Sequence, residues 1–218
     1  MFTRRAAARH AIRLRAGVRG HGQVLTLSKN MLREVPLSIG ACKKLKTLEL
    51  KDNPGLSIPP KYIVRQGPSK CAEYLVCFGA AMDGEHKLDL SQRKLTSFPP
   101  EVTWLGRALR SLDLSSNISI GTLPYIVCEL SGLTALTVDS SKVWGRITQG
   151  LGFLTALTHL SLASNEIVSV PIGLGYATGL EKLVLEKNWT LRLPPREIQV
   201  NSVGTISGAA ASRLCLKR

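Results

Sequence analysis

One short pattern recurs four times between Leu109 and Leu193, and it constrains the fold more than any other feature of the chain. Aligned, the four copies share L-x-x-L-x-L-x-x-N, usually followed by a proline and a further apolar residue, and they start 23 or 24 residues apart. Only one copy is degenerate, with Val138 in a leucine position and Ser141 in the asparagine position. A fixed period of this length predicts a repeat protein, in which each unit buries its apolar face against its neighbours.

Three earlier copies precede these four, which gives about seven in all. Their asparagine positions hold Asn30, Asn53 and Arg93. Arg93 is the exception, because a charge stands there where the other copies have an amide or a hydroxyl. We expect its side chain either to turn outward or to pair with an acid such as Asp113.

The repeated pattern resembles the leucine-rich repeat. That resemblance implies an α/β fold, a leucine-rich repeat solenoid of about seven repeats with a parallel sheet on its concave face. The residues agree: leucines that alternate with polar residues form a strand with one buried face. The asparagine can satisfy backbone groups where the chain turns, since a buried polar group without a partner costs about 1–3 kcal/mol. We therefore expect one seven-stranded parallel sheet.

Two asparagines of the pattern also lie in N-x-[ST] glycosylation motifs, Asn117-Ile118-Ser119 and Asn188-Trp189-Thr190. Because both occupy the asparagine position of their repeats, we expect them to face inward and to serve the backbone. Trp144 and Trp189 follow their strands near the sheet edge. They are either anchors for a partner or packing residues.

The second repeat departs from the period. Leu48 should have a counterpart about 23 residues later, yet the next one, Leu88, comes 40 residues on. The additional stretch has helical spacing and begins with Gly67 and Pro68, which suits the first turn of a helix. We predict a helical insertion, 61–84, on the convex side of repeat two, with a break between two stacks as the alternative.

Further motifs narrow the resemblance. Asn53-Pro54, Pro59-Pro60, Gly67 and Tyr74-Leu75 resemble the end of a repeat stack in cytosolic Ras-group (Shoc-2-like) leucine-rich-repeat scaffolds. Repeats four and five contain G-T-L-P and G-R-I-T, which resemble the G-x-I-P variant of plant-type repeats. The Ras-group resemblance implies an interaction scaffold in intracellular signalling and a cytoplasmic location.

The positive charge is concentrated at the two ends of the chain. Of the formal net charge of +14, six arginines lie in residues 1–20 and three cations in residues 202–218, and neither segment contains an acid. We therefore do not expect the repeats themselves to bind nucleic acid. We divide the chain into a basic arm or transit-like segment (1–20), a leucine-rich repeat domain (21–201) and a C-terminal cap or tail (202–218).

Three alternatives remain open for this organisation. An Arg-rich, acid-poor start resembles a mitochondrial or plastid transit peptide. The same arm suits a protein that associates with nucleic acid. The chain also fits a fragment of a larger receptor or kinase.

No catalytic or metal-binding motif occurs in the sequence. There is no G-x-S-x-G, H-E-x-x-H or Walker lysine, and no histidine pairs with a cysteine or carboxylate at ligand spacing. Five scattered cysteines do not form a disulfide framework, and we expect them to be reduced and mostly buried. We therefore expect no enzyme activity, cofactor, metal or small-molecule substrate. The sequence contains no apolar run long enough to span a membrane, and we expect a monomer.

The remaining candidate site is the outer face of the strands, where the side chain between the two strand leucines points away from the core. That ladder is small, polar and slightly acidic, which suits a protein partner with basic or hydroxyl groups. The candidate partner-binding residues are Thr26, Glu49, Lys51, Asp89, Asp113, Thr137, Asp139, His159, Ser161 and Glu186.

Overall fold

The computed structural model describes residues 23–171, 173–174, 177, 179–192 and 205–206. The chain divides into two compact units, unit 1 (Met1–Gly79) and unit 2 (Ala80–Arg218). The predicted arm, 1–20, lies outside the described residues, as does the predicted tail, 202–218, apart from 205–206. The predicted repeat domain, 21–201, extends over both units.

Unit 1 begins with two parallel strands, β1 (Val24–Thr26) and β2 (Thr47–Glu49), which follow the first two copies of the repeated pattern. Leu25 pairs with Leu48 in register, so that one repeat separates the two strands. A short 3-10 helix, η1 (Leu37–Ala41), returns the chain between them. Leu48 of β2 and Leu50, directly after the strand, lie in the core of the unit.

The segment 61–84 contains α1 (Lys61–Val64), α2 (Pro68–Ala80) and most of the π-helical turn η2 (Ala81–Glu85). Pro68 opens α2, where its missing N–H removes no hydrogen bond. Gly67 precedes it with a φ of 109°, a conformation that favours glycine.

Helix α2 packs closely on η1 inside unit 1. Its buried side includes Tyr74, Leu75 and Phe78, and the rings of Tyr74 and Phe78 are 5.2 Å apart. Gly40 of η1 and Gly79 of α2 lie against each other, because a Cβ added to either glycine would meet the backbone of the other segment. These two glycines therefore set the distance between the helix and the first repeat.

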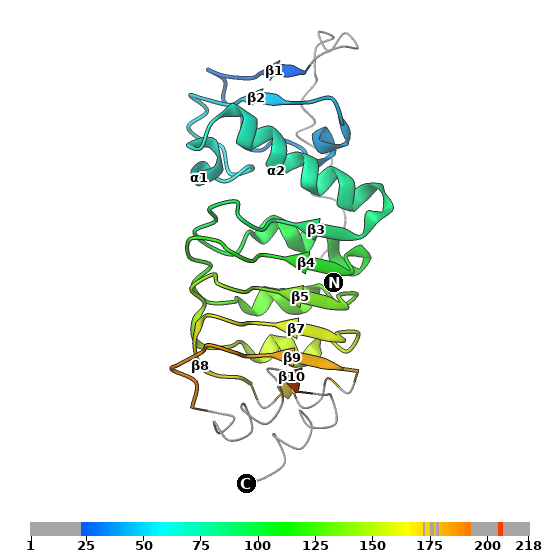
Figure 1. Ribbon diagram of the computed structural model, residues 1–218. Helices are drawn as coiled ribbons and strands as arrows, with labels where there is room; N and C mark the ends of the chain where they lie inside the picture. The colour runs from blue at the N-terminus through cyan, green and yellow to red at the C-terminus, as the bar shows by residue number, and fades with distance from the viewer. Residues whose placement is uncertain (1–22, 172, 175–176, 178, 193–204, 207–218) are drawn as a thin grey trace. The chain divides into compact units, whose positions relative to one another are not determined.

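The main sheet of unit 2 has six strands. Five are parallel and follow the pattern in chain order: β3 (Lys87–Asp89), β4 (Ser111–Asp113), β5 (Ala135–Thr137), β7 (His159–Ser161) and β9 (Lys182–Val184) (Figure 1). The sixth, β10 (Thr205–Ile206), pairs antiparallel with β9. The central leucines of the five parallel strands stand in register and are at most 2% exposed: Leu88, Leu112, Leu136, Leu160 and Leu183.

The chain returns between the strands of unit 2 through 3-10 helices, η3 (Pro100–Ala108), η4 (Tyr125–Glu129) and η5 (Gln149–Phe153). A second, two-stranded parallel sheet, β6 (Trp144–Arg146) and β8 (Glu166–Ser169), follows the turns after β5 and β7. This sheet was not predicted from the sequence.

The prediction of one seven-stranded parallel sheet was wrong. The strands β1 and β2 pair with each other, and no hydrogen-bonded pair of described strands joins them to the sheet of unit 2. The cause is the stretch of 40 residues from Leu48 to Leu88, since it folds as α1 and α2 instead of supplying the next strand.

An amide ladder runs through the turns that follow the strands. The Nδ2 of Asn165 donates to the carbonyl oxygens of Leu162 in its own repeat (2.9 Å) and Val138 in the preceding repeat (2.7 Å). Its Oδ1 accepts the backbone N–H groups of Ser141 and Val143, both at 3.0 Å. The side chains that make the same kind of bridge are those of Asn53, Asn117 and Asn188.

These contacts explain the degenerate repeat and the glycosylation motifs. The hydroxyl of Ser141 replaces part of the amide, because it donates to Leu114 O (2.8 Å) and accepts the N–H of Asn117 (3.2 Å). Asn117 and Asn188 are 5% and 6% exposed, so that their amides serve the backbone as expected.

In each of the seven repeats, the residue before the asparagine position has a φ between 52° and 60°, in the left-handed region. Such a conformation costs about 1–2 kcal/mol for a residue with a Cβ, and none of the seven is glycine. The ladder bonds and the stacked leucines offset this cost at every turn. The residues concerned are Lys29, Asp52, Gln92, Ser116, Ser140, Ser164 and Lys187.

Candidate partner-binding face

The outward-pointing side chains of unit 2 form three columns on one side of the main sheet. They alternate with the buried leucines and continue in register from strand to strand. We call this surface the strand face. Its columns are Lys87, Ser111, Ala135, His159 and Lys182; Asp89, Asp113, Thr137, Ser161 and Val184; and Ser91, Ser115, Asp139, Ala163 and Glu186.

Two carboxylates stand side by side in the middle column. Asp89 pairs in register with Asp113 across β3 and β4. Each uses one oxygen, Oδ1, to accept the backbone N–H two residues on, that of Ser91 (2.9 Å) or Ser115 (2.8 Å). Within the described residues, no lysine or arginine forms an ion pair with either carboxylate.

This arrangement favours a cation from outside the chain. Like charges directly opposite each other on neighbouring strands destabilise a sheet. A bound cation would relieve that repulsion, and both Oδ2 atoms lack a hydrogen bond to any described residue. Asp89 is exposed and Asp113 is half-buried, so that both can be reached from solvent.

Asp139, also predicted as a binding residue, is held by the next repeat. Its carboxylate accepts the hydroxyl of Ser161 at 2.7 and 2.9 Å and the backbone N–H of Ala163 at 2.8 Å. Both oxygens are therefore engaged within the protein, and Ser161 shares that engagement. Asp139 and Ser161, both predicted as binding residues, therefore bond to each other and connect two neighbouring repeats.

The other predicted residues divide between the units. Thr137, His159 and Glu186 lie on the strand face, and the Nδ1 of His159 is 2.9 Å from the hydroxyl oxygen of Thr158. Unit 1 holds the remaining three on β1, on β2 or directly after β2: Thr26, Glu49 and Lys51. The structure thus brings seven of the ten predicted residues onto one sheet.

Arg93 was predicted either to turn outward or to pair with an acid such as Asp113, whose Oδ1 accepts the backbone N–H of Ser115. The Arg93 side chain is half-buried, and its backbone N–H donates to the Oδ1 of Asn117 at 3.1 Å. The backbone of Arg93 therefore takes part in the ladder although its side chain is not an amide.

The sequence analysis missed two exposed arginines, Arg146 and Arg192, near the exposed Trp144 and Trp189. Trp144 and Arg146 lie two residues apart and belong to β6. The alternation K-V-W-G-R from Lys142 to Arg146 was the available signal, because alternate residues of a strand point to one side.

The described residues contain neither a metal site nor a membrane span. They hold no cluster of three or more His, Cys, Asp or Glu side chains that could bind a metal ion. None of the helices described is both long enough and apolar enough to cross a bilayer.

The cysteines correct one expectation. Cys42, Cys71, Cys77 and Cys128 are free, yet only Cys71 is buried, so the prediction that they are mostly buried was wrong. Burial raises the pKa of the Cys71 thiol to about 11, and this thiol therefore stays protonated near neutral pH.

Comparisons with known proteins agree with the repeat geometry, although no protein-family model matches the sequence. The Plant intracellular Ras-group-related LRR protein 8 of Oryza sativa subsp. japonica is 35% identical over 107 residues, which cover 48% of this chain and 28% of that protein. The Probable serine/threonine-protein kinase pats1 of Dictyostelium discoideum is 26% identical over 167 residues, 75% of this chain and 5% of that protein.

A solved leucine-rich repeat protein of Leptospira interrogans has a similar fold. It superposes with a TM-score of 0.50 at 27% identity and covers 80% of this chain and 39% of that one. The matches to the two curated relatives span 28% and 5% of the relatives' own lengths. The structural likeness and the parallel strands support an α/β leucine-rich repeat fold, which the resemblance of the sequence implied.

Proposed function

We propose that this chain is a protein-interaction scaffold that binds a partner on the strand face of unit 2, the concave face in a leucine-rich repeat solenoid. The observation that carries the proposal is the in-register pair Asp89 and Asp113, whose charges no cation of the described residues neutralises. The partner surface that fits it is basic, with lysine or arginine side chains opposite the two carboxylates.

The rest of the strand face supports recognition of a protein. Toward β9 its middle column continues with Thr137, Ser161 and Val184, and the two flanking columns also carry charged side chains, among them Asp139, Lys182 and Glu186. These side chains offer hydrogen bonds and charges to a partner. The described contacts of His159 and Asp139 are with Thr158 and Ser161, so that the two do not form an acid–base pair with each other. We therefore propose a binding role without catalysis, for a chain that acts as a monomer.

We place the proposed function in intracellular signalling, in the cytoplasm. The support is the likeness to the rice protein whose name describes it as intracellular and Ras-group-related. The match covers 28% of that relative.

Affinity capture with charge-reversed protein tests the proposal. We compare wild type, the double variant Asp89→Lys/Asp113→Lys and the control Glu129→Lys, which reverses an exposed charge on η4. If wild type and the control capture a protein that the double variant captures at least tenfold less, this result supports the strand face as the binding site. Identical capture by all three folded proteins contradicts it. Asp139 is left unchanged, because its carboxylate holds the next repeat.

A further inference from the structure

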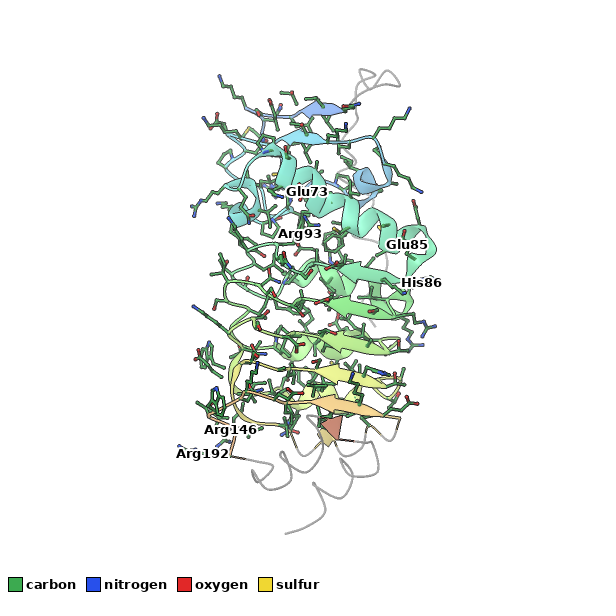
Figure 2. All side chains as sticks on the ribbon, viewed as in Figure 1. Glu73, Glu85, His86, Arg93, Arg146 and Arg192 are labelled. Carbon is green, nitrogen blue, oxygen red and sulfur yellow. The ribbon has the colours of Figure 1, made fainter. Side chains whose placement is uncertain are left out.

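A second surface of unit 2 combines exposed tryptophans with arginines. Trp144 of β6 is 55% exposed, and Trp189, directly after the last ladder asparagine, is 78% exposed. Arg146 and Arg192 are exposed beside them. Figure 2 shows both arginines on the same side of unit 2, one above the other.

Strand β8 lies between β6, which carries Trp144 and Arg146, and the segment 187–192, which carries Trp189 and Arg192. Across β6 and β8, Trp144 pairs with Glu166 and Arg146 pairs with Ser169. On the opposite side, the N–H of Arg192 donates to Val168 O at 2.9 Å. Because each segment is bonded to β8 as a neighbouring strand would be, their backbones lie about 10 Å apart, twice the usual strand spacing.

An open cavity lies between β8 and the second segment. It has a volume of about 550 Å³ and is lined by Val168, Trp189, Thr190, Leu191 and Arg192. The lining combines aliphatic side chains and an indole with a guanidinium group. These groups suit one large apolar side chain next to a carboxylate.

The charge of this surface is opposite to that of the aspartate pair on the strand face. The segments 142–146, 166–169 and 187–192 contain four cations and one acid, and we call this surface the tryptophan edge. Its charged residues are Lys142, Arg146, Glu166, Lys187 and Arg192.

We propose that the tryptophan edge binds an acidic, extended peptide segment of a partner protein. One large apolar side chain of the peptide occupies the cavity, and carboxylates of the peptide pair with Arg146 and Arg192. Tryptophan and arginine are the residues that most often carry binding energy at protein interfaces, and the guanidinium fork matches a carboxylate. This site is separate from the strand face and does not depend on its function.

The observations favour a peptide over single-stranded nucleic acid. Glu166 stands between the two cationic segments, and it would repel a strand that carries a phosphate at every nucleotide. A peptide can space its acids so that they meet the arginines and avoid Glu166. The aliphatic lining from Val168 and Leu191 also suits a side chain better than the flat stack that bases require.

Selection from a random dodecapeptide display library on the full chain tests the proposal. We expect wild type and the control Arg107→Glu, an exposed arginine of η3, to enrich peptides with several acids around one aromatic or leucine residue. The variant Arg146→Glu/Arg192→Glu should lose that enrichment. Selected peptides without an acidic bias, or the same peptides on all three proteins, would overturn the proposal.

Titration of the best selected peptide, fluorescently labelled, gives the second measurement. We expect Trp189→Ala and the neutral variant Arg146→Gln/Arg192→Gln each to raise Kd at least tenfold. The control Trp104→Ala, 58% exposed on η3, and Asp89→Lys/Asp113→Lys should leave Kd unchanged. Equal Kd for Trp189→Ala and wild type, with thermal melts that show both proteins to be folded, would contradict the cavity as the binding site of the peptide.

We also titrate a twelve-nucleotide oligothymidine. If it binds more tightly than the peptide and the same arginine variants lose that binding, the partner of this surface is nucleic acid and the peptide proposal is wrong.

Discussion

A primary amide has one acceptor and two donor hydrogens in a plane, and this is what the turn after each strand requires. Asn165 bonds two backbone N–H groups and three carbonyl oxygens with a single side chain. A hydroxyl can satisfy fewer groups, and Ser141 accordingly leaves the N–H of Ser119 to bond with Leu95 O at 3.1 Å. Asn30 represents the opposite case, because it is exposed and its side-chain bonds to described residues lie within its own repeat.

We expect Asn165→Ala to lower the free energy of unfolding by at least about 1–3 kcal/mol, because buried backbone groups lose their partner. Asn30→Ala should cost less, since water can replace its bonds. Urea denaturation of the two variants and wild type measures the difference. Equal stability of all three would contradict the role of the ladder.

Single residues were predictable where the period fixes their environment. The buried leucines and the inward asparagines followed from the alternation of apolar and polar residues. The engagement of Asp139 did not, because it depends on the registration of Ser161 in the next repeat and on the rotamers of both side chains.

At the scale of elements, α2 and η1 approach each other closely. Gly40 is buried, and a Cβ at this position would meet the backbone at Leu75 and Gly79. A helix that approaches another segment without intervening side chains depends on glycine on both sides.

We expect Gly40→Ala to destabilise unit 1 by about 1–3 kcal/mol, the usual cost of overpacking. Gly55→Ala is the matched control, since its nearest atom would be Leu32 O at 3.7 Å, an ordinary contact. Hydrogen exchange of the amides of α2 reports the effect. Unchanged protection in Gly40→Ala would show that α2 can move away without cost.

The strands of the repeats and the helix in 61–84 were visible in the sequence, but their pairing was not. Helical spacing identifies a helix without saying which surface it covers. It also does not show that the sheet of β1 and β2 ends at β2, where the chain continues into α1 and α2. The ribbon of β6 and β8 was missed because its segments lie after the asparagine position, outside the alternating part of the repeat that predicts the main strands.

In unit 2, the leucines of each repeat stack on those of neighbouring repeats. Leu114 is fully buried directly after β4, and β4 bonds to β3 on one side and β5 on the other. Stability in such an array is close to a sum of repeat and interface contributions. Damage to one repeat should therefore spread to its neighbours.

We expect Leu114→Ala to cost about 2–5 kcal/mol and to speed hydrogen exchange in β3, β4 and β5. Ile118→Ala, which shortens a half-exposed side chain in the following turn, should change stability by less than about 0.5 kcal/mol. Thermal melts and exchange measured on both variants test this. Wild-type stability of Leu114→Ala would contradict stacking through the leucines.

The candidate strand face was predictable to the extent that it follows strand geometry. Seven of the ten predicted residues share one sheet, while Thr26, Glu49 and Lys51 fall in the other. The tryptophan edge was only partly visible, because Arg146 and Arg192 come close through the pairing of segments that are far apart in sequence.

The ladder also has a direction. In each case described, the amide oxygen reaches back to the repeat before it: Asn53 to Leu32, Asn117 to Leu95, Asn165 to Val143 and Asn188 to Ile167. On the ribosome, where the chain emerges from its N-terminus, a newly made turn stays open until the next repeat has been translated. The nascent protein therefore always has one unfinished turn at its growing end, and a stalled or prematurely terminated chain keeps it.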